Sequence, residues 1–213
     1  LTGADLVSLR ITLPLAISFF TFQQIAYLVD AYRERIPKHD FNSYALFILL
    51  FPQLIAGPIV RFQEFFPQIG HLGSRLQSRL SDIAIGLSFF ALGLIKKSLI
   101  ADNLALYVDP LFAAAGAGDP ITFAEAWTSV LCFSFQIYFD FSAYSDMAIG
   151  LTRLFGIQLP FNFNSPYKAS SLIDFWRRWH MTLSRFLRDF LYIPIGGNQG
   201  GQLSQSRNIL IVM

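Results

Sequence analysis

The sequence is poor in cysteine and in charged residues. Cys132 is the one cysteine in 213 residues, which excludes a disulfide framework and a cysteine-based metal site. Charged residues make up 14% of the chain, against roughly 25% in a typical soluble domain. The formal net charge is only +2, and the basic residues form short clusters rather than one stripe, which argues against nucleic-acid binding. The three histidines lack ligand-like spacing, so we expect no metal and no bound cofactor.

Apolar residues dominate instead, at 54% of the sequence. This composition predicts an integral membrane protein, with long apolar stretches close to the ~20 residues that a helix needs to cross a bilayer. Pro52 and the pair Gly57-Pro58 interrupt the second stretch, which predicts a broken or re-entrant helix there. The fold class that we expect is all-α, a polytopic transmembrane helical bundle with a re-entrant or broken helix and interfacial amphipathic helices. The four stretches are Ile11–Val29, Tyr44–Val60, Ile83–Ile100 and Phe123–Phe155.

Loop charges suggest an orientation, because short cytoplasmic loops carry an excess of Lys and Arg. Basic residues on both sides of the second stretch, among them Arg35 and Arg75, predict that both of its ends lie in the cytoplasm. Residues 101–122 contain Asp but neither Lys nor Arg, which predicts an outer loop. We expect residues 1–213 to form a single membrane domain that is an internal piece of a longer protein.

Residues 174–189 combine one histidine, four arginines and two tryptophans. Ser171 and Asp174 have the spacing of a capping box, which predicts one amphipathic helix from Leu172 to about Tyr192. An ionisable group in hydrocarbon costs at least about 2.5 kcal/mol, and such groups usually face a bundle interior or a water-filled path. His180, on the apolar side of this helix, is therefore the first candidate for chemistry. Its neutral imidazole can act as a base or donor near pH 7, or simply hydrogen-bond to a neighbouring helix.

Other polar residues have two interpretations each. In the fourth stretch Gln136, Asp140 and Tyr144 share one helix face, which lines a path or makes interhelical hydrogen bonds. The arginines bind phosphates of a donor or of lipid headgroups, or they form ion pairs such as Asp174–Arg178 and Arg185–Asp189. Asn162, Asn164 and Pro166 are typical of a turn that leads into the His180 helix. The arginines concerned are Arg177, Arg178, Arg185 and Arg188.

Several long motifs together resemble one family. The segments Asp174-Phe-Trp-Arg-Arg-Trp-His-Met-Thr-Leu-Ser184 and Arg188-Asp-Phe-Leu-Tyr-Ile-Pro-Ile-Gly-Gly197 are similar to the signature region of membrane-bound O-acyltransferases, in particular the bacterial branch that includes alginate O-acetyltransferases. Leu13–Gln24, Phe51–Arg61, Tyr138–Asp146 and Pro160–Tyr167 resemble the same branch, in the same order.

The resemblance implies a multi-pass protein of the cell inner membrane with a tunnel through its bundle. In that tunnel an acyl thioester from the cytoplasm, acetyl-CoA or an acyl carrier, would meet a hydroxyl acceptor. His180 matches the first of two polar residues that carry the chemistry in the family, a His or an Asn. The second, in a Trp-His-Gly motif, is expected beyond Met213. Further tunnel candidates are Trp176, Trp179, Ser184, Asp140, Tyr144, Asp146 and Asn164.

The acceptor that the resemblance implies is an extracytoplasmic polysaccharide such as alginate, with membrane lipids and a separate periplasmic or surface acetyltransferase as partners. D-alanyl transfer to teichoic acid and acetylation of peptidoglycan or another envelope polymer are the alternatives. A transporter or lipid flippase would also have broken helices and intramembrane carboxylates, but it gives no reason for the Trp-His segment.

Overall fold

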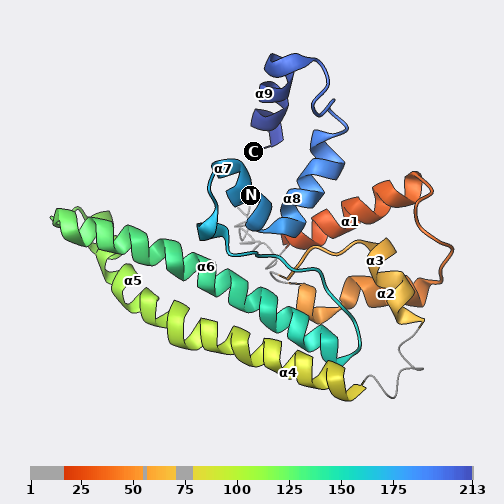
Figure 1. Cartoon of the computed structure of the whole chain (residues 1–213), viewed down its shortest axis with the longest axis horizontal. Coiled ribbons are helices and arrows are strands. Elements are labelled where there is room, and N and C mark those ends of the chain that lie inside the picture. Colours follow the sequence, from red (N-terminus) through yellow and green to blue (C-terminus); the bar gives the residue numbers. More distant parts are fainter. Residues whose placement is uncertain (1–16, 55–56, 71–78, 213) are drawn as a thin grey trace, which may run out of the picture.

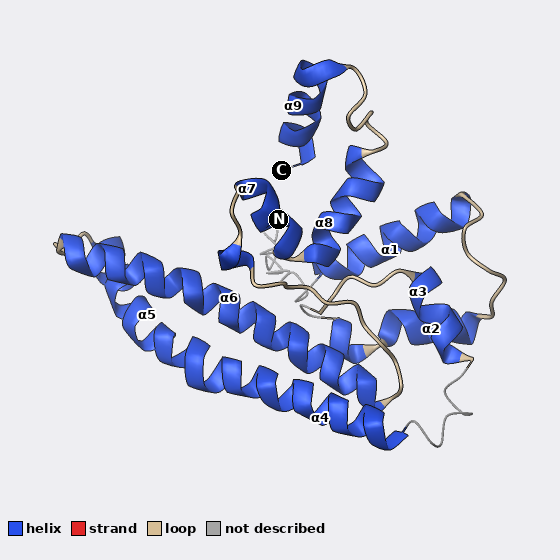
Figure 2. Ribbon diagram, in the orientation of Figure 1, coloured by secondary structure: helices blue, strands red, loops and turns tan. Residues whose placement is uncertain are grey.

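The computed structural model describes residues 17–54, 57–70 and 79–212, and within them the chain is helical with no strand. Figure 2 shows helices joined by short loops. In Figure 1 the long helices lie together in one layer and the shorter helices lie beside and above it. The α-helices are α1 (Ile17–Tyr32), α2 (Phe41–Leu49), α3 (Phe62–Ile69), α4 (Arg79–Ile95), α5 (Asp102–Ala117), α6 (Phe123–Leu154), α7 (Leu172–Arg178), α8 (Met181–Leu187) and α9 (Gly201–Val212).

The long layer is a helical hairpin. A π-helical turn, Lys96–Ala101, joins α4 to α5 without a break, and α6 returns along both. The continuous stretch Leu80–Ala117, at 38 residues, is the one helix in the described part that is long and apolar enough to cross a membrane. This agrees with a membrane protein, whereas the polytopic bundle stays a prediction.

Residues 101–122 are mostly helical rather than the predicted loop, and their place on the outer side stays a prediction. Helix α5 occupies most of the range, and Gly118 ends the helix in a left-handed conformation with φ 84°. The aspartate near its start, Asp102, pairs with Lys97 at 2.8 Å. Helix α5 therefore continues the apolar stretch that was predicted to end at Ile100.

Glycines let the backbones of α4 and α6 approach closely. A Cβ built on Gly150 would lie 2.6 Å from the carbonyl oxygen of Gly86 and 2.6 Å from the amide nitrogen of Phe90. A Cβ on Gly93 would lie 2.6 Å from the carbonyl oxygen of Ala143. Small residues at a helix–helix crossing are typical of membrane proteins.

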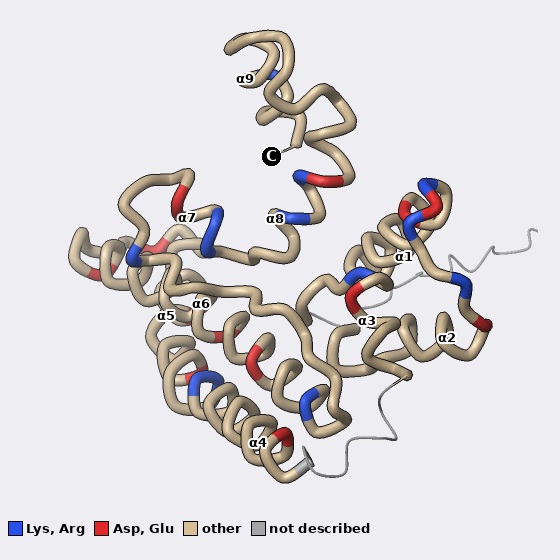
Figure 3. Tube along the Cα trace, turned by 45° about the vertical axis from the view of Figure 1, so that its right-hand side comes forward, with Lys and Arg blue, Asp and Glu red and all other residues tan. Residues whose placement is uncertain are grey.

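Ion pairs also join the hairpin, and Figure 3 shows how few charged residues its helices carry. Because a π-helix has more residues per turn than an α-helix, the successive lysines Lys96 and Lys97 both reach carboxylates of α6. The pairs are Lys96–Asp146 at 2.5 Å, Lys97–Asp140 at 2.6 Å and Arg153–Asp82 at 2.8 Å.

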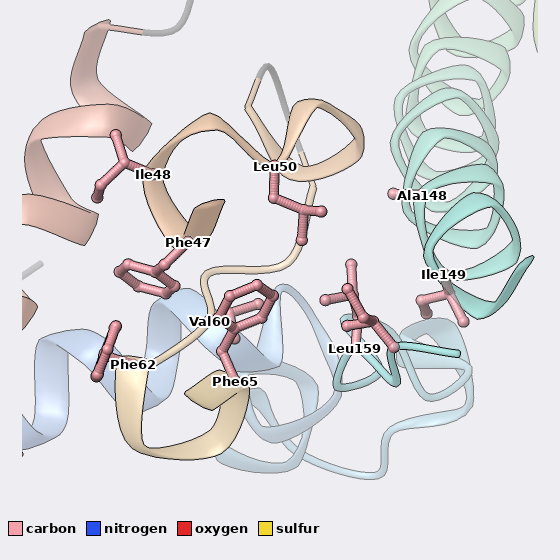
Figure 4. Close-up of a cluster of buried hydrophobic side chains, with 10 residues drawn as sticks. Phe47, Ile48, Leu50, Val60, Phe62, Phe65, Ala148, Ile149 and Leu159 are labelled. Atoms are coloured by element: carbon pink, nitrogen blue, oxygen red, sulfur yellow. The ribbon is translucent and has the colours of Figure 1, made fainter. Parts of the chain in front are cut away.

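The buried core lies where α2 and α3 meet the C-terminal half of α6. Figure 4 shows Phe47, Phe62 and Phe65 packed together; Phe65 is fully buried. The second apolar stretch breaks at the predicted place, since α2 ends at Leu49 and a 3-10 turn, Phe51–Gln53, contains Pro52. The core also contains Ile48, Leu50, Val60, Ala148, Ile149, Ile157 and Leu159.

Candidate active site

The helix predicted from Leu172 to Tyr192 is broken at its histidine. Helix α7 ends at Arg178, Trp179 is extended, and His180 has φ 44° and ψ 55°, in the left-handed region. Helix α8 begins at Met181, and a π-helical turn, Arg188–Tyr192, follows it. The residues that were expected to share faces along one helix therefore belong to two helices of different direction.

The loop that precedes α7 causes this break by hydrogen-bonding to both sides of it. The amide of Asn164 donates to the carbonyl of Arg178 at 2.9 Å, and the amide of Met181 donates to the carbonyl of Asn162 at 2.8 Å. The Ser184 hydroxyl donates to the carbonyl of Trp176 at 3.1 Å. These bonds satisfy backbone groups that a continuous helix would have paired internally.

The predicted start of α7 is correct. The Asp174 amide donates to the Ser171 hydroxyl at 3.1 Å, as the capping box requires. The reciprocal bond differs from the prediction, because the Asp174 carboxylate accepts from the amide of Ser170, at 3.4 Å.

His180 lies inside the protein, with 6% of its surface exposed. Its Nδ1 lies 2.9 Å from Oδ1 of Asn162. Phe19 stacks on the imidazole at 6.1 Å between ring centroids, and the edge-on ring of Phe141 lies at 4.8 Å. Burial lowers the pKa of His180 to about 4, because desolvation disfavours the charged form. The ring is therefore neutral near pH 7.

Asn162 connects His180 to three other parts of the chain. It is 1% exposed, and its Oδ1 accepts from the amide of Thr182 at 3.3 Å and from the Thr182 hydroxyl at 2.9 Å. Its Nδ2 donates to the Ser145 hydroxyl of α6 at 3.3 Å, and the Ile59 amide donates to the Thr182 hydroxyl at 3.0 Å. From the sequence, Asn162 was assigned only to a turn, and no local pattern indicated its burial.

Trp179 is held in an aromatic cluster. Its ring lies 5.2 Å from Phe163 and 5.6 Å from Phe175, with Tyr138 and Tyr167 completing the cluster. Trp176, by contrast, is 43% exposed on the surface of α7. The cluster fixes the extended residue directly before His180.

The other tunnel candidates do not meet at His180. Asp140 and Asp146 form the ion pairs with the lysines of the π-helical turn. Tyr144 packs against the buried core, and the side chain of Asn164 is exposed. Asp140, Asp146 and Tyr144 do lie on one helix, α6, as predicted.

Three of the four arginines are used in ion pairs. Arg178 pairs with Asp174 at 3.0 Å, as expected. The predicted Arg185–Asp189 pair is wrong: Arg185 binds both carboxylate oxygens of Glu64, at 2.6 and 3.0 Å. Asp189 pairs with Arg188 and Arg61.

Arg177 is exposed and makes no ion pair within the described ranges. A phosphate contact of Arg177 stays a prediction.

A small cavity adjoins the histidine through Phe19, which lines the cavity and stacks on His180. Gln53 also lines it. The amide nitrogen Nε2 of Gln53 donates to the Phe47 carbonyl at 2.9 Å, while the buried amide oxygen Oε1 has no hydrogen-bond partner. The described residues contain no group of three His, Cys, Asp or Glu side chains arranged to hold a metal ion.

The sequence of the chain is similar to those of known proteins. The model of the membrane-bound O-acyltransferase family matches residues 11–213. A peptidoglycan O-acetyltransferase of Helicobacter pylori is 48% identical over 96% of this chain and 43% of its own length. A probable alginate O-acetylase of Pseudomonas aeruginosa is 43% identical over 96% of this chain and 38% of its own length.

A teichoic acid D-alanyltransferase of Streptococcus thermophilus is more distant, at 28% identity over 85% of this chain and 44% of its own length. The chain thus spans about two fifths of the length of the curated relatives that it matches. The family match covers nearly all of the chain, including His180 and the loop that holds it, and the chain belongs to the membrane-bound O-acyltransferase family.

Proposed function

We propose that the full-length protein is a membrane-embedded O-acyltransferase that moves an acetyl group from a cytoplasmic thioester to hydroxyls of an extracytoplasmic polysaccharide. The observation that carries this proposal is the buried, neutral His180, held by Asn162 within a chain of this family. A buried imidazole that stays neutral near pH 7 keeps one ring nitrogen free to accept a hydrogen bond and the other able to donate one.

The chemistry requires a base, donors for an oxyanion and a leaving thiolate. The acceptor hydroxyl loses its proton, its oxygen forms a bond to the thioester carbon, the C–S bond breaks, and the thiolate takes up a proton. The family resemblance assigns the base to a second histidine beyond Met213. His180 would then orient the acceptor hydroxyl or stabilise the developing charge.

The acceptor that we propose is an envelope or exported polysaccharide. The names of the Helicobacter pylori and Pseudomonas aeruginosa relatives support this class, and peptidoglycan and alginate are the two candidates that they give. D-alanyl transfer to teichoic acid is the weaker candidate, because the relative so named is 28% identical. Assaying the purified full-length protein with each polymer and each activated acyl donor would distinguish them.

We also propose that a separate periplasmic or surface transferase completes the reaction. The region once expected to be an outer loop consists mostly of helix α5, which leaves only residues 118–122 between α5 and α6. A soluble domain typically needs at least ~50 residues, so this connection cannot form one. Deleting the partner should abolish polymer acetylation while the membrane protein still consumes acyl donor. Unaided acetylation of the polymer by the purified full-length protein would contradict the relay.

The central test is His180→Ala in the full-length protein, expressed in its own membrane. We expect greatly reduced polymer acetylation with normal insertion. His39→Ala is the matched control, because His39 is a half-buried histidine that bonds to Tyr27 outside this site. Near-normal acetylation by His180→Ala would reject the role of His180. If donor is not consumed by the wild-type protein but a lipid or ion crosses the membrane, a transporter or flippase is indicated instead.

A further inference from the structure

The hydrogen bonds around Asn162 identify which of its side-chain atoms faces the histidine. The backbone amide of Thr182 can only donate, and it points at the Asn162 atom that lies 3.3 Å away. That atom must accept, so it is the carbonyl oxygen Oδ1. Exchanging the oxygen and nitrogen of the amide would set an NH2 group against the Thr182 amide. The same exchange would set the oxygen against Ser145, where Nδ2 now donates.

The identity of this atom decides where the proton of His180 lies. Oδ1 of Asn162 is 2.9 Å from Nδ1 of His180, and an oxygen that only accepts requires a donor opposite it. In a neutral imidazole one nitrogen carries the hydrogen and the other carries the lone pair. The hydrogen therefore lies on Nδ1, and the lone pair lies on Nε2.

The contacts of the His180 ring favour this ring orientation. Phe19 stacks on one side of the ring and Phe141 meets it edge-on. A half-turn of the imidazole would place a C–H group against Oδ1 and lose the hydrogen bond. The position of Asn162 is itself fixed by the backbone. The backbone carbonyl of Asn162 accepts from the amide of Met181, the residue directly after His180, at 2.8 Å.

We propose that Asn162 is a positioning residue that holds His180 as the Nδ1–H tautomer, so that Nε2 receives a hydrogen bond from the acceptor hydroxyl. This inference rests on the proposed acyl transfer and refines it. A neutral imidazole with a lone pair on Nε2 can accept from a hydroxyl but cannot donate to an oxyanion. Of the two roles open to His180, orienting the acceptor is the one that this tautomer allows.

Among the described residues, the contacts of the imidazole are with groups that do not ionise: Phe19 of α1, Phe141 of α6 and the Asn162 amide. Burial is the cause of the lowered pKa of His180. An added charge at position 162 should thus act directly on His180.

The tautomer can be measured directly in the wild-type full-length protein. Nitrogen-15 labelling of histidine, with solid-state NMR in liposomes, distinguishes a protonated from an unprotonated ring nitrogen. The His180 signals are identified as those missing from His180→Asn. We expect protonated Nδ1 and unprotonated Nε2 at neutral pH. The opposite tautomer would overturn the proposal without any variant at position 162 having to fold.

Activity variants test the functional consequence. Asn162→Asp keeps the acceptor and adds a negative charge beside the ring, which favours the charged imidazole. The acid limb of the pH–rate profile should move to higher pH by about 1 unit or more. Asn162→Leu removes the acceptor, and kcat should fall about 10- to 100-fold, as for other partners that orient a histidine, with KM for the acyl donor little changed.

Asn198→Asp is the matched control for charge. Asn198 is exposed and accepts from the Tyr192 hydroxyl outside this network. The Asn198→Asp protein should therefore have the pH–rate profile of the wild type. An unmoved acid limb in a folded Asn162→Asp protein would overturn the positioning role. Normal transfer by His180→Ala would reject the role of His180, whatever tautomer the NMR spectra show, whereas no acyl transfer by the wild-type full-length protein would reject the proposed function.

Discussion

The crossing of α4 and α6 gives a sharp prediction for Gly150→Ala. The new methyl group would lie 2.6 Å from two backbone atoms of α4, the oxygen of Gly86 and the nitrogen of Phe90. Neither atom can rotate away, so the helices must separate. Overpacking costs typically ~1–3 kcal/mol, and a backbone clash belongs at the upper end. Replacing Gly by Ala in a helix returns about 1 kcal/mol, which leaves a net destabilisation of about 1–2 kcal/mol.

Gly116→Ala is the matched control within the same hairpin. Gly116 lies in α5, and a Cβ built on it has no neighbour within 4 Å. Only the helix-propensity term then applies, so this variant should be stabilised by up to ~1 kcal/mol. The same chemical change should thus shift stability in opposite directions at the two positions.

Thermal unfolding of the purified full-length protein in detergent, followed by size-exclusion chromatography, provides the measurement. A change of 1 kcal/mol moves the Tm by roughly 2–4 °C in a domain of about 200 residues, and by less in a longer protein. We expect a lower Tm for Gly150→Ala and an unchanged or higher Tm for Gly116→Ala. Equal shifts in both variants, or a wild-type Tm in Gly150→Ala, would refute the close crossing of α4 and α6.

Three further predictions concern pH, a helix cap and an ion pair. The pKa of His180 is about 4 in the folded protein, against an ordinary value of 6.5. Between pH 6.5 and pH 4 the histidine is therefore protonated in the unfolded chain but neutral in the folded protein. Stability should fall by about 3 kcal/mol as the pH drops from 6.5 to 4, and His180→Asn should flatten that part of a Tm-versus-pH curve. Thr122→Ala removes the capping box that starts α6 and should cost about 1 kcal/mol in thermal unfolding, whereas a comparable loss in Thr122→Ser would contradict a capping role. Glu64→Gln weakens the bidentate, half-exposed pair with Arg185 and should cost at most about 1 kcal/mol; because salt screens such a pair, the difference from the wild type should shrink at high ionic strength.

The elements that the sequence predicted well are those set by local signals. Phe123–Phe155 was predicted as one long helix and α6 runs from Phe123 to Leu154, since the apolar run that indicates it lies within the segment. The interruption near Pro52 was likewise found, because proline acts on its own backbone. Whether that segment re-enters the membrane stays a prediction, and Arg75 lies outside the described residues.

The features that the sequence could not predict depend on distant partners. The break at His180 needs hydrogen bonds from a loop 18 residues upstream, and no helical periodicity records them. The Arg185–Glu64 pair spans 121 residues, whereas the local spacing favoured Asp189. Helix α5 was mistaken for a loop because Asp102, Asp109 and Asp119 were taken as charges of a loop, although Asp102 has a lysine partner within the same hairpin.

The left-handed backbone at position 180 restricts evolution as well as chemistry. With φ 44° and ψ 55°, this position suits few side chains: Gly adopts the conformation freely, and Asn, Asp and His are several-fold enriched among the others. A β-branched residue here would disturb the fold before any effect on acyl transfer was felt. The family resemblance implies His or Asn at this point, and both belong to this short set. The backbone therefore selects in advance the few polar side chains from which a new acyltransferase of this fold can evolve.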